Sequence, residues 1–103
     1  MRDRPGPPAI TFTIDDPLVS ASRQDTVAGT VRAEDPDGID SVWVMLQTVE
    51  KGENGGFDRI FSSRYRFLVG AGFTPGDHIP LVFRARDIAG FQVQRDTYVV
   101  VVP

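Results

Sequence analysis

Residues 26–44, TVAGTVRAEDPDGIDSVWV, hold two alternating apolar stretches separated by a turn sequence. In the first stretch, Val27 and Val31 fall on one face of an extended chain, and in the second Val42 and Val44 do the same. This period of two is typical of a half-buried β-strand. Between the stretches, Asp-Pro-Asp-Gly suits a tight turn, because proline fits its second position and glycine tolerates a positive φ. We therefore predict two strands joined by a short turn.

The rest of the chain repeats this pattern, and turn residues interrupt it about every eight to twelve positions. No run has the period of about 3.6 residues that indicates a helix. The predicted strands are Ala9–Ile14, Asp25–Glu34, Ile39–Val49, two short strands near Arg59–Ser62 and Arg64–Val69, His78–Asp87 and Phe91–Val102. The glycine-rich segments Glu50–Gly56 and Gly70–Asp77 are predicted loops. About seven short antiparallel strands predict an all-β sandwich.

Length and composition indicate one domain. The chain has 103 residues, 41% of them hydrophobic and none of them cysteine, which is enough for one core without disulfide bonds. We assign the charged, proline-rich residues 1–8 to a tether and residues 9–103 to a single domain. The net charge of -3 and the scattered arginines do not favour nucleic-acid binding. No apolar segment approaches the roughly 20 residues that span a bilayer, so we expect no membrane insertion.

Three segments of the chain point to a family. They are PPAITFTI, the stretch TVAGTVRAEDPDGIDSVWV, and PGDHIPLVFRARDIAGFQVQ with the valine-rich strand after it. Together they resemble bacterial immunoglobulin-like domains of the cadherin and fibronectin type III-like kind. The resemblance implies a Greek-key immunoglobulin-like sandwich that is exported as one module, commonly in tandem, of a larger extracellular or cell-surface protein. Met1 is followed by RDRPGPP and not by a signal peptide, which also favours a module of a larger protein.

The same resemblance implies a spacer or adhesion module that contacts neighbouring domains or another protein. An alternative is an accessory domain of a secreted hydrolase that binds carbohydrate or another ligand. We expect no catalysis, because the only histidine, His78, has no serine or cysteine nucleophile motif near it.

The motif Ala-x-Asp-x-x-Gly occurs twice, in RAEDPDGI at residues 32–39 and in RARDIAGF at residues 84–91. In an immunoglobulin-like fold the loops that follow these two strands lie at one end of the sandwich. Asp35, Asp37 and Asp87 should therefore converge. Cadherins place calcium ligands at domain junctions in similar motifs, so by resemblance these three aspartates are a candidate calcium site.

Two interpretations of the aspartates remain open. Calcium takes about six to eight oxygen ligands, and three carboxylates alone are too few. The arginines of RDRPGPP also differ from the acidic linker that the cadherin sites use. Alternatively, the aspartates accept backbone N–H groups in Asx turns and bind no cofactor. The sequence favours the turn interpretation.

A second candidate site is the outward face of two neighbouring strands. If the alternation directs the valines of 39–49 inward, Trp43 and Met45 point outward, and Pro80 and Val82 do so on the strand 78–87. These four residues would form an apolar interaction patch. If the partner is a polysaccharide, Trp43 and Tyr98 are the stacking candidates. A register shift of one residue would instead bury Trp43, as many immunoglobulin domains do on this strand.

Overall fold

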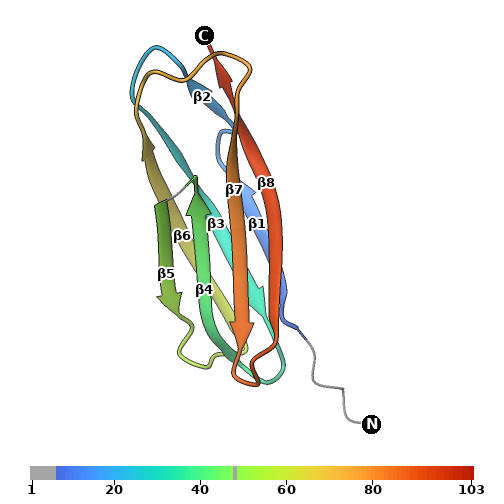
Figure 1. The fold of residues 1–103 in the computed structure, drawn as a ribbon. Helices are drawn as coiled ribbons and strands as arrows, with labels where there is room; N and C mark the ends of the chain where they lie inside the picture. Colours follow the sequence, from blue (N-terminus) through green and yellow to red (C-terminus); the bar gives the residue numbers. More distant parts are fainter. Residues whose placement is uncertain (1–6, 48) are drawn as a thin grey trace.

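The computed structural model describes residues 7–47 and 49–103, which form β-strands and connecting loops (Figure 1). The strands are β1 (Ala9–Ile14), β2 (Leu18–Ser20), β3 (Asp25–Glu34), β4 (Ile39–Leu46), β5 (Val49–Asn54), β6 (Ile60–Val69), β7 (His78–Asp87) and β8 (Gln92–Val102). The described residues include no helix that could cross a membrane. The all-β prediction is confirmed.

The strands form two sheets that pack face to face. One sheet has the order β1-β3-β6 and the other the order β2-β8-β7-β4-β5. All neighbouring strands are antiparallel except β2 and β8, which are parallel. The chain passes from the first sheet to the second at Asp15-Asp16-Pro17, where Asp16 Oδ1 accepts a hydrogen bond from the N–H of Leu18 at 3.0 Å.

The inward faces of the two sheets supply one core. Six side chains on these inward faces are buried, namely Val27, Val31, Val42, Val44, Leu81 and Phe83. Phe83 lies at the centre of the aromatic packing, stacked on Phe12 at 4.2 Å and edge-on to Tyr65 at 5.3 Å between ring centroids. Burial of such rings is a large part of the stability of a domain of this size.

One polar contact inside the core depends on a glycine. The Tyr65 hydroxyl donates a hydrogen bond to the Thr13 carbonyl oxygen at 2.6 Å, and burial raises the pKa of Tyr65 to about 12. Gly29 lies beside this bond, and a Cβ at position 29 would stand 2.5 Å from the Tyr65 hydroxyl oxygen. Glycine is therefore required at position 29 by close packing of the strands.

Three details of the prediction are wrong. Residues 50–54, predicted as loop, belong to β5, and the predicted strand 39–49 ends at Leu46, where Gln47 turns the chain with a φ of 56°. All six residues of β5 are exposed, so this strand has no apolar alternation to read. The two short strands predicted in 59–69 are one strand, because all ten residues of β6 pair with β3.

The strand β2 was not predicted at all. It has three residues and pairs in parallel with β8, so the sandwich has eight described strands, not all of them antiparallel. Most of the predicted tether lies outside the described residues, and β1 begins at Ala9, as predicted.

Candidate functional site

The two copies of the repeated motif end at the same end of the molecule, where β1 also begins (Figure 1). Asp35 directly follows β3, and Asp87 is the last residue of β7. The N–H of Ile88 donates a hydrogen bond to the carbonyl oxygen of Gly38 at 3.1 Å, which joins the two loops. Gly38 has a φ of 109°, so the first turn requires its glycine. The predicted proximity of the two motifs is confirmed.

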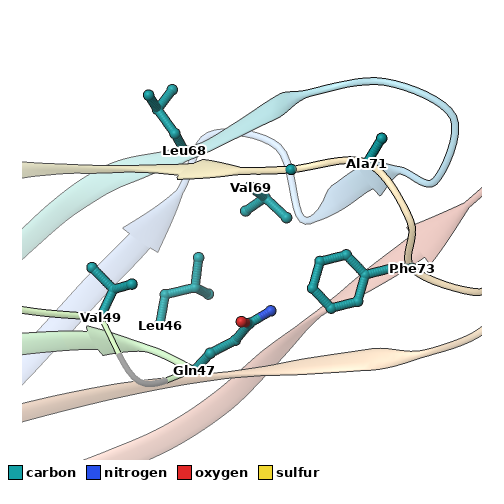
Figure 2. A pocket seen from close by; sticks show the side chains of 8 residues that line it. Leu46, Gln47, Val49, Leu68, Val69, Ala71 and Phe73 are labelled. Carbon is teal, nitrogen blue, oxygen red and sulfur yellow. The ribbon is translucent and has the colours of Figure 1, made fainter.

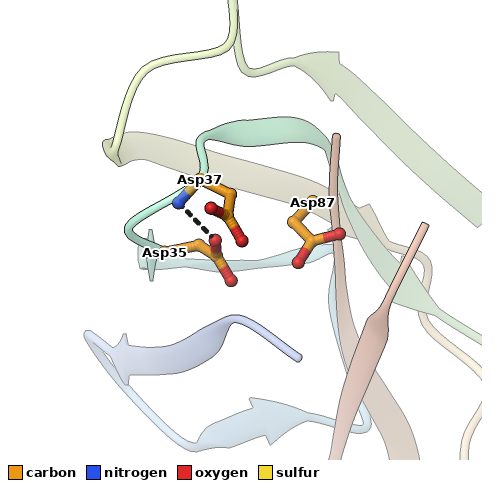
Figure 3. Close-up of side chains that lie close together, drawn as sticks. All are labelled: Asp35, Asp37 and Asp87. Carbon is orange, nitrogen blue, oxygen red and sulfur yellow. Dashed lines mark hydrogen bonds between the residues drawn. The ribbon is translucent and has the colours of Figure 1, made fainter. Parts of the chain in front are cut away.

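The structure brings Asp35, Asp37 and Asp87 together at this end (Figure 3). One carboxylate oxygen of each residue lies within 4.8 Å of the corresponding oxygens of the other two. Asp35 and Asp87 are buried, with exposed fractions of 2% and 1%, while Asp37 is exposed. Two carboxylates thus lie close together where little water can screen them.

Hydrogen bonds within the loops account for part of this cluster. Asp35 Oδ1 accepts the N–H of Asp37 at 2.8 Å, and Asp87 Oδ1 accepts the N–H of Phe91 at 2.9 Å. These are the bonds that the turn interpretation predicts. Asp87 Oδ2 is buried and has no hydrogen-bond partner among the described residues. Since buried carboxylate oxygens are normally paired, this atom needs a further partner that the turn does not supply.

The pKa of Asp35 reflects its burial and the nearby carboxylate of Asp87. Burial raises the pKa of Asp35 above its ordinary value of 3.8, the N–H of Asp37 opposes this rise, and the neighbouring Asp87 carboxylate adds to it. Without a cation Asp35 therefore binds a proton more readily than an ordinary aspartate. A cation placed between the carboxylates would reverse the effect, because it stabilises their charged forms.

The donor set suits a hard divalent cation. Calcium prefers carboxylate and carbonyl oxygens and tolerates irregular geometry, whereas histidine and cysteine ligands typical of zinc are absent from this cluster. Three carboxylates provide about half of the six to eight oxygens that calcium takes. Water or a neighbouring chain would have to provide the others.

The second candidate site lies on the outer face of the five-stranded sheet. Trp43, Met45 and Val82 are partly buried there and Pro80 is exposed. Met45 and Val82 are directly paired across β4 and β7, as the predicted neighbourhood of these strands requires. The register that directs Trp43 outward is the one that was predicted.

Charged neighbours of Trp43 were not anticipated from the sequence. The guanidinium carbons of Arg84 and Arg86 lie 5.8 and 5.6 Å from the centroid of the indole ring. On the other side, Gly52 of β5 leaves room for the ring, because a Cβ there would stand 2.8 Å from Trp43 Cδ1. The sequence could have placed Arg84 and Arg86 on this face, because alternate residues of a strand share a face and Pro80 and Val82 belong to the same alternation. It could not have placed Gly52, whose position depends on the unpredicted strand β5.

A pocket of about 180 Å³ opens between the sheets near the start of β5 (Figure 2). Apolar side chains and the amide of Gln47 form its walls, and none of the described residues that line it is titratable; the apolar ones are Leu46, Val49, Leu68, Val69 and Phe73. The described part of the lining therefore offers no acid, base or nucleophile. His78 lies elsewhere, exposed and stacked on Tyr98 at 4.0 Å between ring centroids.

Comparison of the chain with models of protein families, with curated proteins and with solved structures gives no match. The candidate sites thus depend on geometry and chemistry alone.

Proposed function

We propose that the chain is a non-catalytic immunoglobulin-like module of a larger extracellular or cell-surface protein, acting as a spacer or contact domain whose end is stiffened by calcium. The order of strands in the two sheets supports this fold, since β1-β3-β6 and β8-β7-β4-β5 correspond to the two sheets of a fibronectin type III-like sandwich. A rigid sandwich with loops at its ends suits a mechanical role.

The orphaned oxygen of Asp87 is the observation that carries the calcium proposal. It is buried beside two further carboxylates and lacks a partner among the described residues. An acidic cluster alone does not define a metal site, but a buried unpaired carboxylate oxygen within it is stabilised by a bound cation, or by a proton on Asp35 when no cation is bound. Calcium at this position would join the loop after β3 to the end of β7.

The surroundings of the cluster support contact with a neighbouring domain. Phe57, Ile88 and Phe91 are large apolar side chains that remain exposed at this end. The N–H of Phe57 donates to the carbonyl oxygen of Ile39 at 3.0 Å, so Phe57 also belongs to the end that carries the cluster. An adjoining domain could cover these side chains and supply the remaining calcium ligands.

Thermal unfolding in EDTA and in calcium tests the proposal. Extracellular calcium modules bind with dissociation constants as weak as about 1 mM. At about 10 mM calcium such an affinity adds about 1.4 kcal/mol to the free energy of unfolding. For a domain of this size the midpoint should rise by roughly 5–10 °C.

Two variants control for non-specific effects of calcium. Asp35→Asn should abolish the rise, because it removes a buried ligand. Asp96→Asn should keep it, because Asp96 is an exposed residue of β8, where Gln94 Nε2 donates to its carboxylate. An unchanged midpoint of the wild-type chain at this calcium concentration would contradict the proposal.

A further inference from the structure

The two sheets end unevenly on the side of the sandwich that carries β5 and β6 (Figure 1). Leu46 of β4 and Val49 of β5 are directly paired, so their side chains share the face that is turned toward the other sheet. Leu46 is 3% exposed there, whereas Val49 is 55% exposed. The three-stranded sheet therefore covers β4 and stops short of β5. Since β6 is the last strand of its sheet, no strand of the described chain lies beside it opposite β5.

β6 has a free backbone edge along its whole length. Antiparallel strands exchange hydrogen bonds at alternate residues. The N–H of Asp35 donates to the carbonyl oxygen of Arg59 at 2.9 Å, and all ten residues of β6 pair with β3 in the same register. The odd-numbered residues of β6 are therefore bonded to β3. The even-numbered residues direct their N–H and C=O groups away from it, namely Ile60, Ser62, Arg64, Arg66 and Leu68.

This edge lacks several features that keep an edge strand from pairing with another chain. β6 contains no proline or glycine, and its register with β3 is not interrupted by a bulge. The carbonyl oxygen of Arg64 accepts the Ser63 hydroxyl at 3.3 Å, a long bond that a backbone N–H can replace. The edge is thus open to the addition of a strand.

β5 offers a second free edge on the same side. The N–H of Gly55 donates to the carbonyl oxygen of Asp40 at 2.9 Å, in the register that pairs β5 with β4. By the same alternation three residues of β5 direct their backbone groups away from β4, namely Glu50, Gly52 and Asn54. β5 and β6 run in opposite directions (Figure 1). The start of β5 lies level with the end of β6, because Val49 and Leu68 line the same pocket.

We propose that two copies of the chain associate through these edges, with β5 of each copy adding to β6 of the other. A two-fold axis parallel to the strands brings the two open sides together and sets the five-stranded sheet of one copy beside the three-stranded sheet of the other. Both new strand pairs are antiparallel, because β5 and β6 run in opposite directions. The β5 strand of each copy then occupies the place beside β6 that its partner's own chain does not fill. This contact runs along the side of the sandwich and does not depend on the calcium proposal for its end.

The charges on the outer faces of the two edges are complementary. Arg64 and Arg66 lie on the exposed face of β6, where Arg64 is already paired with Asp15. The ion pairs of the described residues include neither Arg66 nor Glu50. An axis along the strands keeps every residue at its own level, so Glu50 of the second copy lies near Leu68 and Arg66. Each dimer gains two pairs between Glu50 and Arg66.

The inward face of β5 also carries opposite charges. Lys51 and Glu53 lie two residues apart on this face, and both are exposed. In the dimer the two β5 strands face each other across the sandwich. Packed sheets lie about 10 Å apart, a distance that a lysine and a glutamate side chain can span together. Lys51 of each copy can thus pair with Glu53 of the other, while the exposed Val49 side chains of both copies cover one another.

The other two-fold arrangement is disfavoured by charge. An axis perpendicular to the sheets would pair β5 with β5 and β6 with β6. It would bring the two positively charged edges of β6 together and leave Glu50 of each copy without Arg66. Like charges on neighbouring strands destabilise their pairing. The charge pattern therefore selects the pairing of unlike edges.

Sedimentation equilibrium in EDTA measures this association without calcium. The average mass should rise from the monomer value of 11.3 kDa toward twice that value between about 10 µM and about 1 mM, the range of weak interfaces. Amide hydrogen exchange locates the contact. Exchange of the Arg66 N–H should slow as the protein concentration rises, whereas the N–H of Phe67, which is bonded to β3, should exchange slowly at every concentration.

An exchange of charges tests the pairing of unlike edges. Arg66→Glu and Glu50→Arg should each weaken association about tenfold or more, because the contact occurs twice in a dimer. The two changes together should restore it. Arg95→Glu, an equal change of charge on an exposed residue of β8, should leave association unchanged.

A proline tests the backbone pairing. The N–H of Leu68 points away from β3, so Leu68→Pro removes a donor of the free edge and no bond between β3 and β6. This variant should not associate. Leu68→Thr removes the same apolar side chain but keeps the N–H, so it should retain part of the association. A thermal melt verifies that both variants are folded.

Three results would overturn the proposal. The first is a wild-type chain that keeps its monomer mass at about 1 mM. The second is stronger association of Arg66→Glu than of the wild type, which would indicate that the two β6 edges meet. The third is a double variant of Arg66→Glu and Glu50→Arg that associates no better than either single variant.

Discussion

Replacing Asp87 with asparagine should stabilise the domain in the absence of calcium and remove its response to calcium. Asparagine keeps the side-chain oxygen that accepts the N–H of Phe91. In place of the orphaned Oδ2 it puts an amide nitrogen, which can donate to the nearby carboxylate of Asp35. The substitution therefore preserves the turn and removes only the negative charge.

The geometry sets the size of the effect. Two carboxylate charges no more than 4.8 Å apart repel by at least about 3.5 kcal/mol at an effective dielectric constant of about 20. Proton uptake by the cluster, favoured by the raised pKa of Asp35, relieves part of this repulsion in the wild type. We expect Asp87→Asn to raise the free energy of unfolding in EDTA by about 1–3 kcal/mol at pH 7.

Urea unfolding followed by circular dichroism, in EDTA and in calcium, measures both effects. The midpoint of Asp87→Asn should exceed that of the wild type in EDTA and should not move when calcium is added. Asp96→Asn serves as the control, since its exposed carboxylate is not part of the cluster. A loss of stability in Asp87→Asn in EDTA would refute the reasoning, because it would mean that the buried charge itself supports the loop.

Two further measurements probe the cluster and the core. The folded pKa of Asp35 is raised above its unfolded value, so the metal-free wild type should lose stability relative to Asp35→Asn as pH rises from about 3.8 through the folded pKa. Saturating calcium should abolish this loss. A stability difference that does not depend on pH in EDTA would contradict the raised pKa. Gly29→Ala should lower the free energy of unfolding by about 2 kcal/mol or more, because its Cβ would collide with Thr13 and the Tyr65 hydroxyl. Unchanged stability in a urea titration of this variant would contradict the close approach of β1, β3 and β6.

The sequence predicts strands well where one face is buried along the whole strand. The predicted limits of β3 and β7 agree with the structure at both ends, because their side chains alternate between core and surface. β5 lacks this signal, since it is a fully exposed edge strand held by pairing with β4 alone. β2 is too short to show a period. Both β2 and β5 form because they pair with segments that are distant or separate in the sequence, and the pattern of a single sequence does not reveal such pairing.

The features of the candidate sites that follow from strand order were predicted, and those that depend on packing between distant segments were not. The convergence of Asp35 and Asp87 follows from the ends of two strands of opposite sheets, and the resemblance to immunoglobulin-like domains predicts it. The burial of both carboxylates and the unpaired oxygen of Asp87 depend on the packing of the loops. The setting of Trp43 depends on a register among three strands, one of which was read as a loop.

The chemistry of the cluster argues that turn formation is an incomplete account of its aspartates. Asparagine or serine at positions 35 and 87 could accept the same backbone N–H groups without placing two negative charges in contact. The chain instead buries both carboxylates and leaves one oxygen without a partner among the described residues. The calcium proposal accounts for this arrangement, because a bound cation would offset the repulsion between the two carboxylates. On the calcium proposal a carboxylate is needed at both positions, whereas the turns alone need only a side-chain oxygen that accepts a backbone N–H.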